Sequence, residues 1–556
     1  MSDTIAILNG RIRTMDADRP VAEAVLIRGN RIAAVGDSGE IAALAGADAL
    51  TIDAAGGTVL PGFNDAHVHI FSGSVGLSQL ALDDVRGFEA LSESIQSHAA
   101  RHPGAGLMVA KGCVYTVISE AERLSRHHLD RILPDRPLML MAFDHHTAWA
   151  NTAALTAAGI LQGRDVGLGN QIVMGDDGFA TGELREANAF APVTALAENG
   201  GRDMLGVSTG GDPETVSDAE RQADIAAIRR GLAYCAELGI TSIQNMDGNL
   251  YQLELLDAIE RDGGLPVRVR MPFHMKNVMP LSDLETKAAR WMQTYATDRL
   301  RCDMVKMFMD GVTESETALF VEDYAHRSGW QGEALFAQAH FNDICATADG
   351  LGLQIAVHAV GDGAVRSVLD GFQHAGERTG KTDRRHRVEH IEVVHPDDVP
   401  RFAKLGAVAS MQPIHAPSGA ELTEEPSPRY IGAARWPHAF AWRDLAEAGA
   451  RIVFSTDWPV VPLNPMISIE AAMTREPFAA GMPDQRLPLD QVLRAYTAEG
   501  AWLERMEDRK GVLKPGFLAD LVVLDGDIHA VAPEDIGRLR PVATICDGAV
   551  TYRRMA

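Results

Sequence analysis

The sequence predicts an α/β protein built around a (β/α)8 TIM barrel, with a composite β-sandwich domain from both termini and a large insert after the first barrel strand. Two patterns predict this fold. Eight short apolar runs alternate with amphipathic segments through the middle of the chain, which is typical of a parallel sheet, and eight such units close a barrel. Both ends of the chain show short apolar stretches between Asp, Gly and Pro turns, which is typical of antiparallel strands.

The eight expected barrel strands follow one another from about residue 65 to about residue 455. They are the runs VLPGFNDAHVH, GITSIQNM, VRVRMPF, MVKMFMDG, LQIAVHAVG, HRVEHIE, AVASMQP and RIVFSTDWP. Helical segments such as DIAAIRRGLAYCAELG and AFAWRDLAEAG lie between them. Each of these segments ends on a Gly, which is a common residue just after a helix C-terminus.

The length of the chain suggests about three to four units or one large barrel with attachments, and the positions of the expected strands divide it into three. A barrel of this kind needs about 250 residues, whereas the chain has 556 residues. We expect residues 1–60 plus 505–556 to form the composite β domain, because neither end alone has enough strands to bury a sheet face. Residues 61–70 plus 211–504 would form the barrel, and residues 71–210 would form an inserted α/β lobe over its mouth.

Composition and charge disfavour several classes of partner. Lys and Arg number 51 against 76 Asp and Glu, which gives a formal net charge of −25 and disfavours nucleic acid and anionic membrane surfaces. We find no apolar stretch of about 18 residues and no secretory pattern, and the five cysteines are scattered without a CxxC pair. We therefore expect a cytoplasmic protein with a small-molecule substrate. The sequence leaves open whether it forms a homodimer.

Five of the eight expected strands end in an imidazole, a lysine or a carboxylate. These residues are His67 and His69 on the first strand, Lys306 on the fourth, His358 on the fifth, His390 on the sixth and Asp457 on the eighth. A single strand-end histidine is usually a core residue, but the ends of parallel barrel strands meet at one mouth. Imidazoles with a carboxylate and no thiolate favour a divalent metal, most simply zinc, with manganese or iron as alternatives. A metal with an open position lowers the pKa of bound water to about 7, which is hydrolase chemistry.

The motifs around these residues carry a family resemblance. PGFNDAHVH, VKMFMDG, HAVGD, RHRVEHIE and STDWP, together with DHHTAWANTAAL, TGELREA, MQPIH and VLKPGFLADLVVLD, resemble the amidohydrolase superfamily. More narrowly, they are similar to its YtcJ-like, amidohydrolase-3 group, which includes N-substituted formamide deformylase. The resemblance covers nearly the whole chain. Its motifs are specific for the family and much less so for the substrate.

The resemblance implies a role for each strand-end residue. His67 and His69 match the first pair of metal ligands, His358 and His390 match the second site, and Asp457 matches an aspartate that binds metal and shuttles protons. Lys306 matches a lysine that carbon dioxide can carbamylate, so that it bridges two metal ions. A cationic anchor for substrate is the alternative role of Lys306. The number of ions, one or two, stays open.

Further residues are candidates for substrate contact. The resemblance suggests that role for His146, with packing as the alternative. It suggests pocket positions for Glu186, Gln412 and Trp458 as well, and we expect these three to support the site rather than to be catalytic. It also places His145 where Gly is frequent, a change that would alter the pocket. Three other histidines lie near strand ends but off the matched positions, and for them we expect solvated or helix-capping roles: His386, His395 and His415.

The sequence therefore predicts a metal-dependent hydrolase that cleaves the C–N bond of an N-substituted or N-acyl small molecule, with Asp457 moving the proton. Hydrolysis of an ester, lactone or carbamate at the same site is the alternative within the enzymes, because the same nucleophile attacks those carbonyls. A metal-free scaffold or binding protein is the alternative from another class. Against the scaffold, all six matched positions are filled in this chain.

Overall fold

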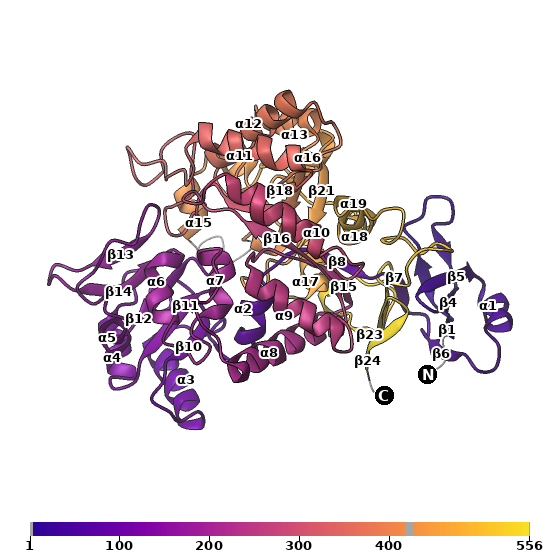
Figure 1. Cartoon of the computed structure of the whole chain (residues 1–556), viewed down its shortest axis with the longest axis horizontal. Helices are drawn as coiled ribbons and strands as arrows, with labels where there is room; N and C mark the ends of the chain where they lie inside the picture. The colour runs from indigo at the N-terminus through magenta and orange to yellow at the C-terminus, as the bar shows by residue number, and fades with distance from the viewer. Residues whose placement is uncertain (1–3, 418–425, 555–556) are drawn as a thin grey trace.

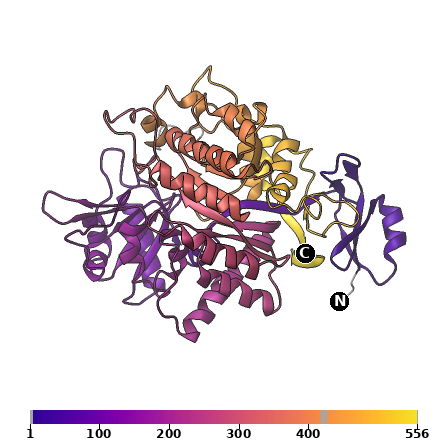
Figure 2. The ribbon, with the colours of Figure 1, turned by 45° about the horizontal axis from the view of Figure 1, so that its top comes forward.

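The computed structural model describes residues 4–417 and 426–554, and it confirms the predicted fold class (Figure 1). An eight-stranded parallel sheet forms the barrel at the centre of the molecule. A lobe from the first third of the chain lies on one side of the barrel, and sheets from the two termini lie on the other side, as Figure 2 also shows. No helix in these described ranges is long and apolar enough to cross a membrane.

The barrel contains all eight predicted strands in sequence order, each parallel to its neighbour. They are β8 (Phe63–Val68), β15 (Ile240–Asn245), β16 (Arg268–His274), β17 (Leu300–Phe308), β18 (Gln354–Ala359), β19 (Arg387–His390), β20 (Val408–Met411) and β21 (Arg451–Phe454). The ring closes just past the end of β21. There the Asp457 N–H donates to the His67 carbonyl at 2.8 Å, and the His69 N–H donates to the Trp458 carbonyl at 2.7 Å.

Helices cover the outside of the barrel. They are α8 (Asp218–Glu237), α9 (Leu250–Arg261), α10 (Ala289–Thr294), α11 (Gln338–Leu351), α12 (Asp362–Thr379), α13 (Val399–Leu405), α16 (Trp442–Glu447), α17 (Pro465–Thr474), α18 (Leu489–Ala495) and α19 (Ala498–Leu503). The short helix α15 (Pro426–Ile431) lies at the barrel mouth. A capping box between Ser217 and Glu220 begins α8, and left-handed glycines end α11 and α12 at Gly352 and Gly380. Strands β15, β16 and β18 are buried along their full length, because the helices cover the face that points away from the barrel interior.

Two sheets contain the terminal strands. One has the order β24-β23-β22-β7-β2-β3 and joins both ends of the chain, since β22 pairs antiparallel with β7. Its strands are β2 (Arg11–Arg13), β3 (Val21–Ala22), β7 (Thr58–Pro61), β22 (Leu521–Leu524), β23 (Pro541–Cys546) and β24 (Ala549–Arg553). The other has the order β5-β4-β1-β6 and contains β1 (Thr4–Leu8), β4 (Ala24–Arg28), β5 (Arg31–Gly36) and β6 (Leu50–Asp53), with α1 (Ser38–Ala45) against it.

Side chains from both ends of the chain, including Ile7, Val25, Val523 and Ile545, form one buried cluster. A buried ion pair from Arg268 to Asp520, at 2.7 Å, connects this part to the barrel.

The inserted lobe has its own six-stranded sheet, in the order β13-β14-β12-β11-β10-β9. The strands are β9 (Leu80–Ala81), β10 (Met108–Cys113), β11 (Leu138–Ala142), β12 (Thr147–Ala150), β13 (Gln171–Met174) and β14 (Ala180–Arg185). The helices are α2 (Ile70–Gly76), α3 (Phe88–Arg101), α4 (Arg126–Ile132), α5 (Thr152–Ala157), α6 (Ala187–Thr194) and α7 (Arg202–Ser208). Leu138 and Leu140 belong to one apolar cluster, whereas Met139 and Met141 belong to another. Alternate side chains of β11 therefore pack on opposite faces of the sheet.

Candidate metal centre and substrate cavity

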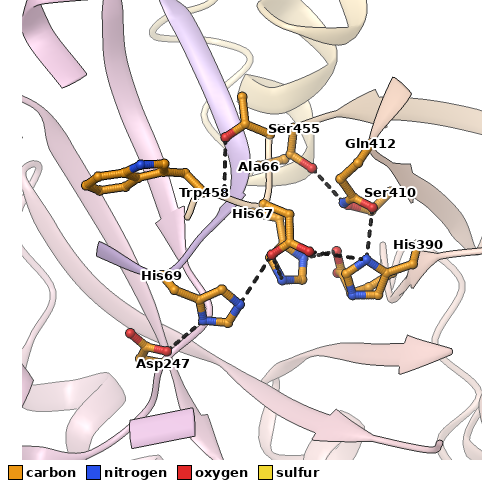
Figure 3. Close-up of polar contacts among 12 residues, drawn as sticks. Ala66, His67, His69, Asp247, His390, Ser410, Gln412, Ser455 and Trp458 are labelled. Carbon is orange, nitrogen blue, oxygen red and sulfur yellow. Dashed lines mark hydrogen bonds and ion pairs between the residues drawn. The ribbon is translucent and has the colours of Figure 1, made fainter. Parts of the chain in front are cut away.

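Histidines at the ends of β8 and β19 lie close to Asp457 at the barrel mouth, and Figure 3 shows His67, His69 and His390 near one another. Nε2 of His67 lies 3.4 Å from Asp457 Oδ1, and Nε2 of His69 lies 3.3 Å from the same oxygen. The His390 ring approaches the other oxygen, with its Nδ1 3.6 Å from Oδ2. The ligand atoms of His67, His69 and Asp457 all lie within 4.8 Å of one another and form a first group that could hold a metal ion.

Each of the four predicted histidine ligands uses one ring nitrogen to donate a hydrogen bond. The acceptors are Glu389 Oε2 for His67 Nδ1 (2.8 Å), Asp247 Oδ1 for His69 Nδ1 (2.7 Å), the Gly311 carbonyl for His358 Nε2 (2.9 Å) and Gln412 Oε1 for His390 Nδ1 (2.9 Å). Because a carboxylate, a carbonyl or an amide oxygen can only accept, the bonded nitrogen carries the proton. Burial lowers the pKa of His67, His358 and His390, so the second nitrogen of these neutral rings keeps a free lone pair, as a metal ligand requires. Burial also acts on His69, but Asp247 and Asp457 outweigh it and raise its pKa to about 9, so a metal ion at His69 Nε2 would replace a proton.

The donor set fits a divalent cation. Nε2 of His67 and Nε2 of His69 both face Asp457 Oδ1, and that oxygen is buried with no hydrogen-bond partner in the described part of the chain. Three such atoms repel one another unless a cation lies between them, and the raised pKa of His69 shows this, because without a metal ion a proton takes that place. Two ligand atoms at 2.0–2.1 Å from a tetrahedral zinc are about 3.3 Å apart, and the two nitrogen–oxygen distances here are 3.3 and 3.4 Å.

Lys306 and His358 lie at their predicted strand ends but outside the groups of close ligand atoms. Lys306 is fully buried on β17, and its Nζ has no hydrogen-bond partner among the described residues. Burial lowers the pKa of Lys306 to about 8, although Glu389 and Asp457 favour its charged form. A buried amine without partners is compatible with the carbamylated form that the family resemblance implies.

His415 corrects an expectation from the sequence. Instead of being solvated or capping a helix, it is largely buried at the barrel mouth, with its Nε2 3.7 Å from Asp457 Oδ2. It forms a second possible metal group with His390 and Asp457. The reason is local: a short 3-10 turn, Pro413–His415, follows β20 and directs the ring over the mouth. His386 is also buried, and its Nε2 lies 3.2 Å from Asp349.

The residues that orient the ligands were missed by the sequence analysis. Glu389 is fully buried between the His67 ring and the guanidinium of Arg387. Burial raises the pKa of Glu389, but Arg387 and His67 lower it far more, so the carboxylate stays ionised. The sequence did contain a signal for Glu389. An Arg and a Glu two positions apart in an apolar strand share one buried face, which indicates a buried ion pair. Nothing in the sequence pointed to Asp247, which follows the end of β15.

A cavity of about 590 Å³ opens above this centre and lies between the barrel mouth and the inserted lobe. His146, from the lobe, lines the cavity, and its Nδ1 lies 2.8 Å from Glu186 Oε2. Glu186 Oε1 accepts hydrogen bonds from Thr317 Oγ1 at 2.7 Å and Ser315 Oγ at 3.2 Å. Burial lowers the pKa of His146, but Glu186 outweighs it and the pKa rises to about 9. The lobe thus presents a charged imidazole to the cavity.

Two predicted substrate contacts lie behind the cavity wall instead. Gln412 accepts from His390 and donates from Nε2 to Ser455 Oγ at 2.8 Å, so both ends of its amide are occupied. Trp458 packs on Gly73, where a Cβ would come within 2.4 Å of the indole, and the indole points away from the histidines (Figure 3). Neither residue is among the described residues that line the cavity. Gln412 therefore orients His390, and Trp458 fills the space beside α2.

Backbone strain gathers around the cavity. His145, Glu186, His390 and Asp457 have φ values of 62°, 65°, 72° and 64°, in the left-handed region that non-glycine residues rarely adopt. Each such residue costs of order 1–3 kcal/mol, and strain of this kind clusters at active sites. The value at His145 explains why the family resemblance places Gly there, since Gly adopts this region without a steric penalty.

Comparison with known proteins identifies the family. The model of the amidohydrolase family matches residues 50–552 of the chain. The chain belongs to the amidohydrolase family. The predicted resemblance is thereby confirmed, and this member of the family is a metal-dependent hydrolase.

Relatives match almost end to end. The protein LONG AFTER FAR-RED 3 of Arabidopsis thaliana is 28% identical, with 94% of this chain and 87% of that protein covered. N-substituted formamide deformylase of Arthrobacter pascens is 26% identical, with 99% and 98% covered. The crystal structure of an uncharacterized metal-dependent hydrolase from Pyrococcus horikoshii shares the fold, with a TM-score of 0.73 and 23% identity over 95% of this chain and 99% of that one.

Proposed function

We propose that this amidohydrolase cleaves the C–N bond of an N-substituted or N-acyl amide. One observation carries the proposal: two imidazole nitrogens, of His67 and His69, and an unpartnered oxygen of Asp457 converge at the base of a cavity of about 590 Å³. A cavity of that volume fits a small molecule. The 26% identity to N-substituted formamide deformylase over 99% of the chain supports an amide substrate.

Divalent ions, most simply zinc, are the proposed cofactor. His67, His69 and Asp457 would hold one ion, and a second would use His358 and His390, with His415 as a further donor and a carbamylated Lys306 as the bridge. When bound, such ions polarise a carbonyl oxygen and lower the pKa of a coordinated water to about 7. The five cysteines are all buried free thiols, which supports a reducing, cytoplasmic location.

The protein's own groups move the proton and orient the substrate. Asp457 is the proposed base that takes a proton from the attacking water and then donates it to the leaving nitrogen. That second transfer is needed because an amide anion is too basic to leave. His146, held by Glu186 on the opposite wall, is the proposed hydrogen-bond donor to the substrate.

A substrate panel tests this function. We expect zinc-loaded protein to hydrolyse formamides or N-acyl amines faster than matched esters, lactones and carbamates of the same size. Asp457→Asn should then lower kcat by about 10²- to 10⁴-fold, the usual contribution of general acid–base catalysis. Metal content must be measured in parallel, because Asp457 also faces the metal position. A preference for esters or lactones, or near-normal kcat in a fully loaded Asn variant, would contradict the proposal.

A further inference from the structure

A lysine outside the metal centre lines the same cavity. Lys276 follows the end of β16, and its Nζ donates to the Val207 carbonyl at 2.7 Å. The ammonium also lies 5.1 Å from the centre of the Phe308 ring. That ring stacks on His358, with centroids 4.7 Å apart. The Phe308 ring therefore lies between Lys276 and His358, a predicted ligand of the metal centre.

Lys276 has no counter-charge in the described parts of the chain. Within residues 4–417 and 426–554, its Nζ forms no ion pair with a carboxylate, and the Val207 carbonyl is its hydrogen-bond acceptor. The carboxylate of Glu186 raises the pKa of Lys276, but it is already bonded to His146, Thr317 and Ser315. The ammonium has three N–H donors and the Val207 carbonyl takes one, so two remain for a ligand.

Burial makes the charged form of the Lys276 amine less favourable. Burial and the neighbouring Lys306 lower the pKa of Lys276 to about 7, against the weaker influence of Glu186. An isolated charge in a dry site is costly, and an anion beside it removes much of that cost. An anionic ligand would therefore be stabilised by this wall of the cavity.

The surroundings favour a carboxylate over a phosphate. A single ammonium matches a single negative charge, whereas a phosphate dianion is usually met by several donors such as an arginine fork. The other basic residue on the cavity wall, Arg86, is exposed and donates from Nη1 to the Asp83 and Val85 carbonyls. It does not join Lys276 in a common site.

We propose that Lys276 binds a carboxylate of the substrate, so that the preferred substrates are amides carrying a carboxylate about one aromatic ring away from the scissile bond. This inference rests on the proposed amidase function. The proposed contact is a charge-assisted hydrogen bond from the Lys276 ammonium to the substrate carboxylate, on the cavity wall beside Phe308. The metal centre would act on the amide at the other end of the same molecule.

A matched pair of substrates tests the inference. N-benzylformamide and its 4-carboxybenzyl analogue differ only in the carboxylate. Zinc-loaded wild-type protein should show a KM about 10- to 100-fold lower for the carboxylated member, the range for a hydrogen bond to a charged group. Lys276→Met should abolish that preference while leaving kcat/KM for the neutral member within about threefold. Arg86→Met, which removes a positive charge from the same cavity, should keep the preference.

Three outcomes would overturn the inference. In the first, the wild-type protein shows no preference for the carboxylated substrate. In the second, the K276M protein keeps that preference. In the third, K276M loses kcat/KM equally on both substrates and melts at a lower temperature. The last result would make Lys276 only a cap on the carbonyl end of α7. Calorimetric binding of the carboxylated compound separates this inference from the proposed function. If no amide is hydrolysed but K276M binds the compound at least about tenfold more weakly than wild type, the amidase function fails and the anchor stands.

Discussion

Replacing Glu389 by Gln would test how the metal ligands are held. Glu389 accepts from His67 Nδ1 at 2.8 Å and from the guanidinium of Arg387 through both of its oxygens. A glutamine keeps one oxygen but puts an amide NH2 where the second oxygen stood. With the NH2 at the Oε1 position, Arg387 Nε faces a donor; with the NH2 at the Oε2 position, both His67 Nδ1 and Arg387 Nη2 face one.

The contacts set the size of the expected effect. Losing a hydrogen bond to a charged partner costs about 1.5–3 kcal/mol, and a buried guanidinium left without its counter-charge costs about 3–5 kcal/mol. Arg387 would keep neutral acceptors at Gln244 Oε1 (2.6 Å) and Ser410 Oγ (3.0 Å). We therefore expect a stability loss of about 3–5 kcal/mol. Zinc affinity should fall about 10- to 100-fold, as is usual when the partner of a histidine ligand is lost.

The assay measures both quantities. Urea unfolding of the metal-free protein gives the stability loss, and competition with a chromophoric chelator gives the zinc affinity. Ser410→Ala is the control, because it removes one neutral acceptor of Arg387 and leaves the carboxylate on His67. It should cost at most about 1.5 kcal/mol and leave zinc affinity unchanged. Wild-type zinc affinity in the Glu389→Gln protein would refute the argument that this carboxylate orients His67.

Three further predictions concern the rest of the chain. A protein that ends at residue 504 should unfold at a lower temperature, because it loses β22–β24 and leaves Arg268 without Asp520; unchanged melting would argue against the shared sheet. His146→Ala should change KM or the ranking of substrates with bound metal intact, whereas loss of metal would identify His146 as a ligand. The His146–Glu186 pair should stabilise the fold below pH 6.5 and lose that contribution as pH rises through about 9, since the pKa of His146 is raised in the folded state. The melting difference between wild type and Glu186→Gln should therefore shrink over that range, and a constant difference would contradict the raised pKa.

The periodic features of the chain were predictable from sequence. The alternation of His67, Val68 and His69 places both imidazoles on one face of a strand whatever the strand packs against. Eight apolar runs separated by helical segments define a barrel, and a barrel brings its strand ends to one mouth. These inferences depend on residues close together in the chain, and the eight strands lie where the sequence placed them.

The surroundings of the site were decided only by tertiary structure. His67 is hydrogen-bonded to Glu389, which is 322 residues later in the sequence, and His69 to Asp247, which is 178 residues later. Sequence spacing carries no signal for such pairs, because the strand order and the twist of the barrel set which side chains meet. The same reason explains why His415 reached the mouth while Gln412 and Trp458 lie behind it. The sequence alone determined that His67, His69, His390 and Asp457 meet at the barrel mouth, because each lies at or just after the end of a barrel strand. Contacts between distant segments decided that His415 joins them, which side chains orient the ligands, which line the cavity and which support its wall.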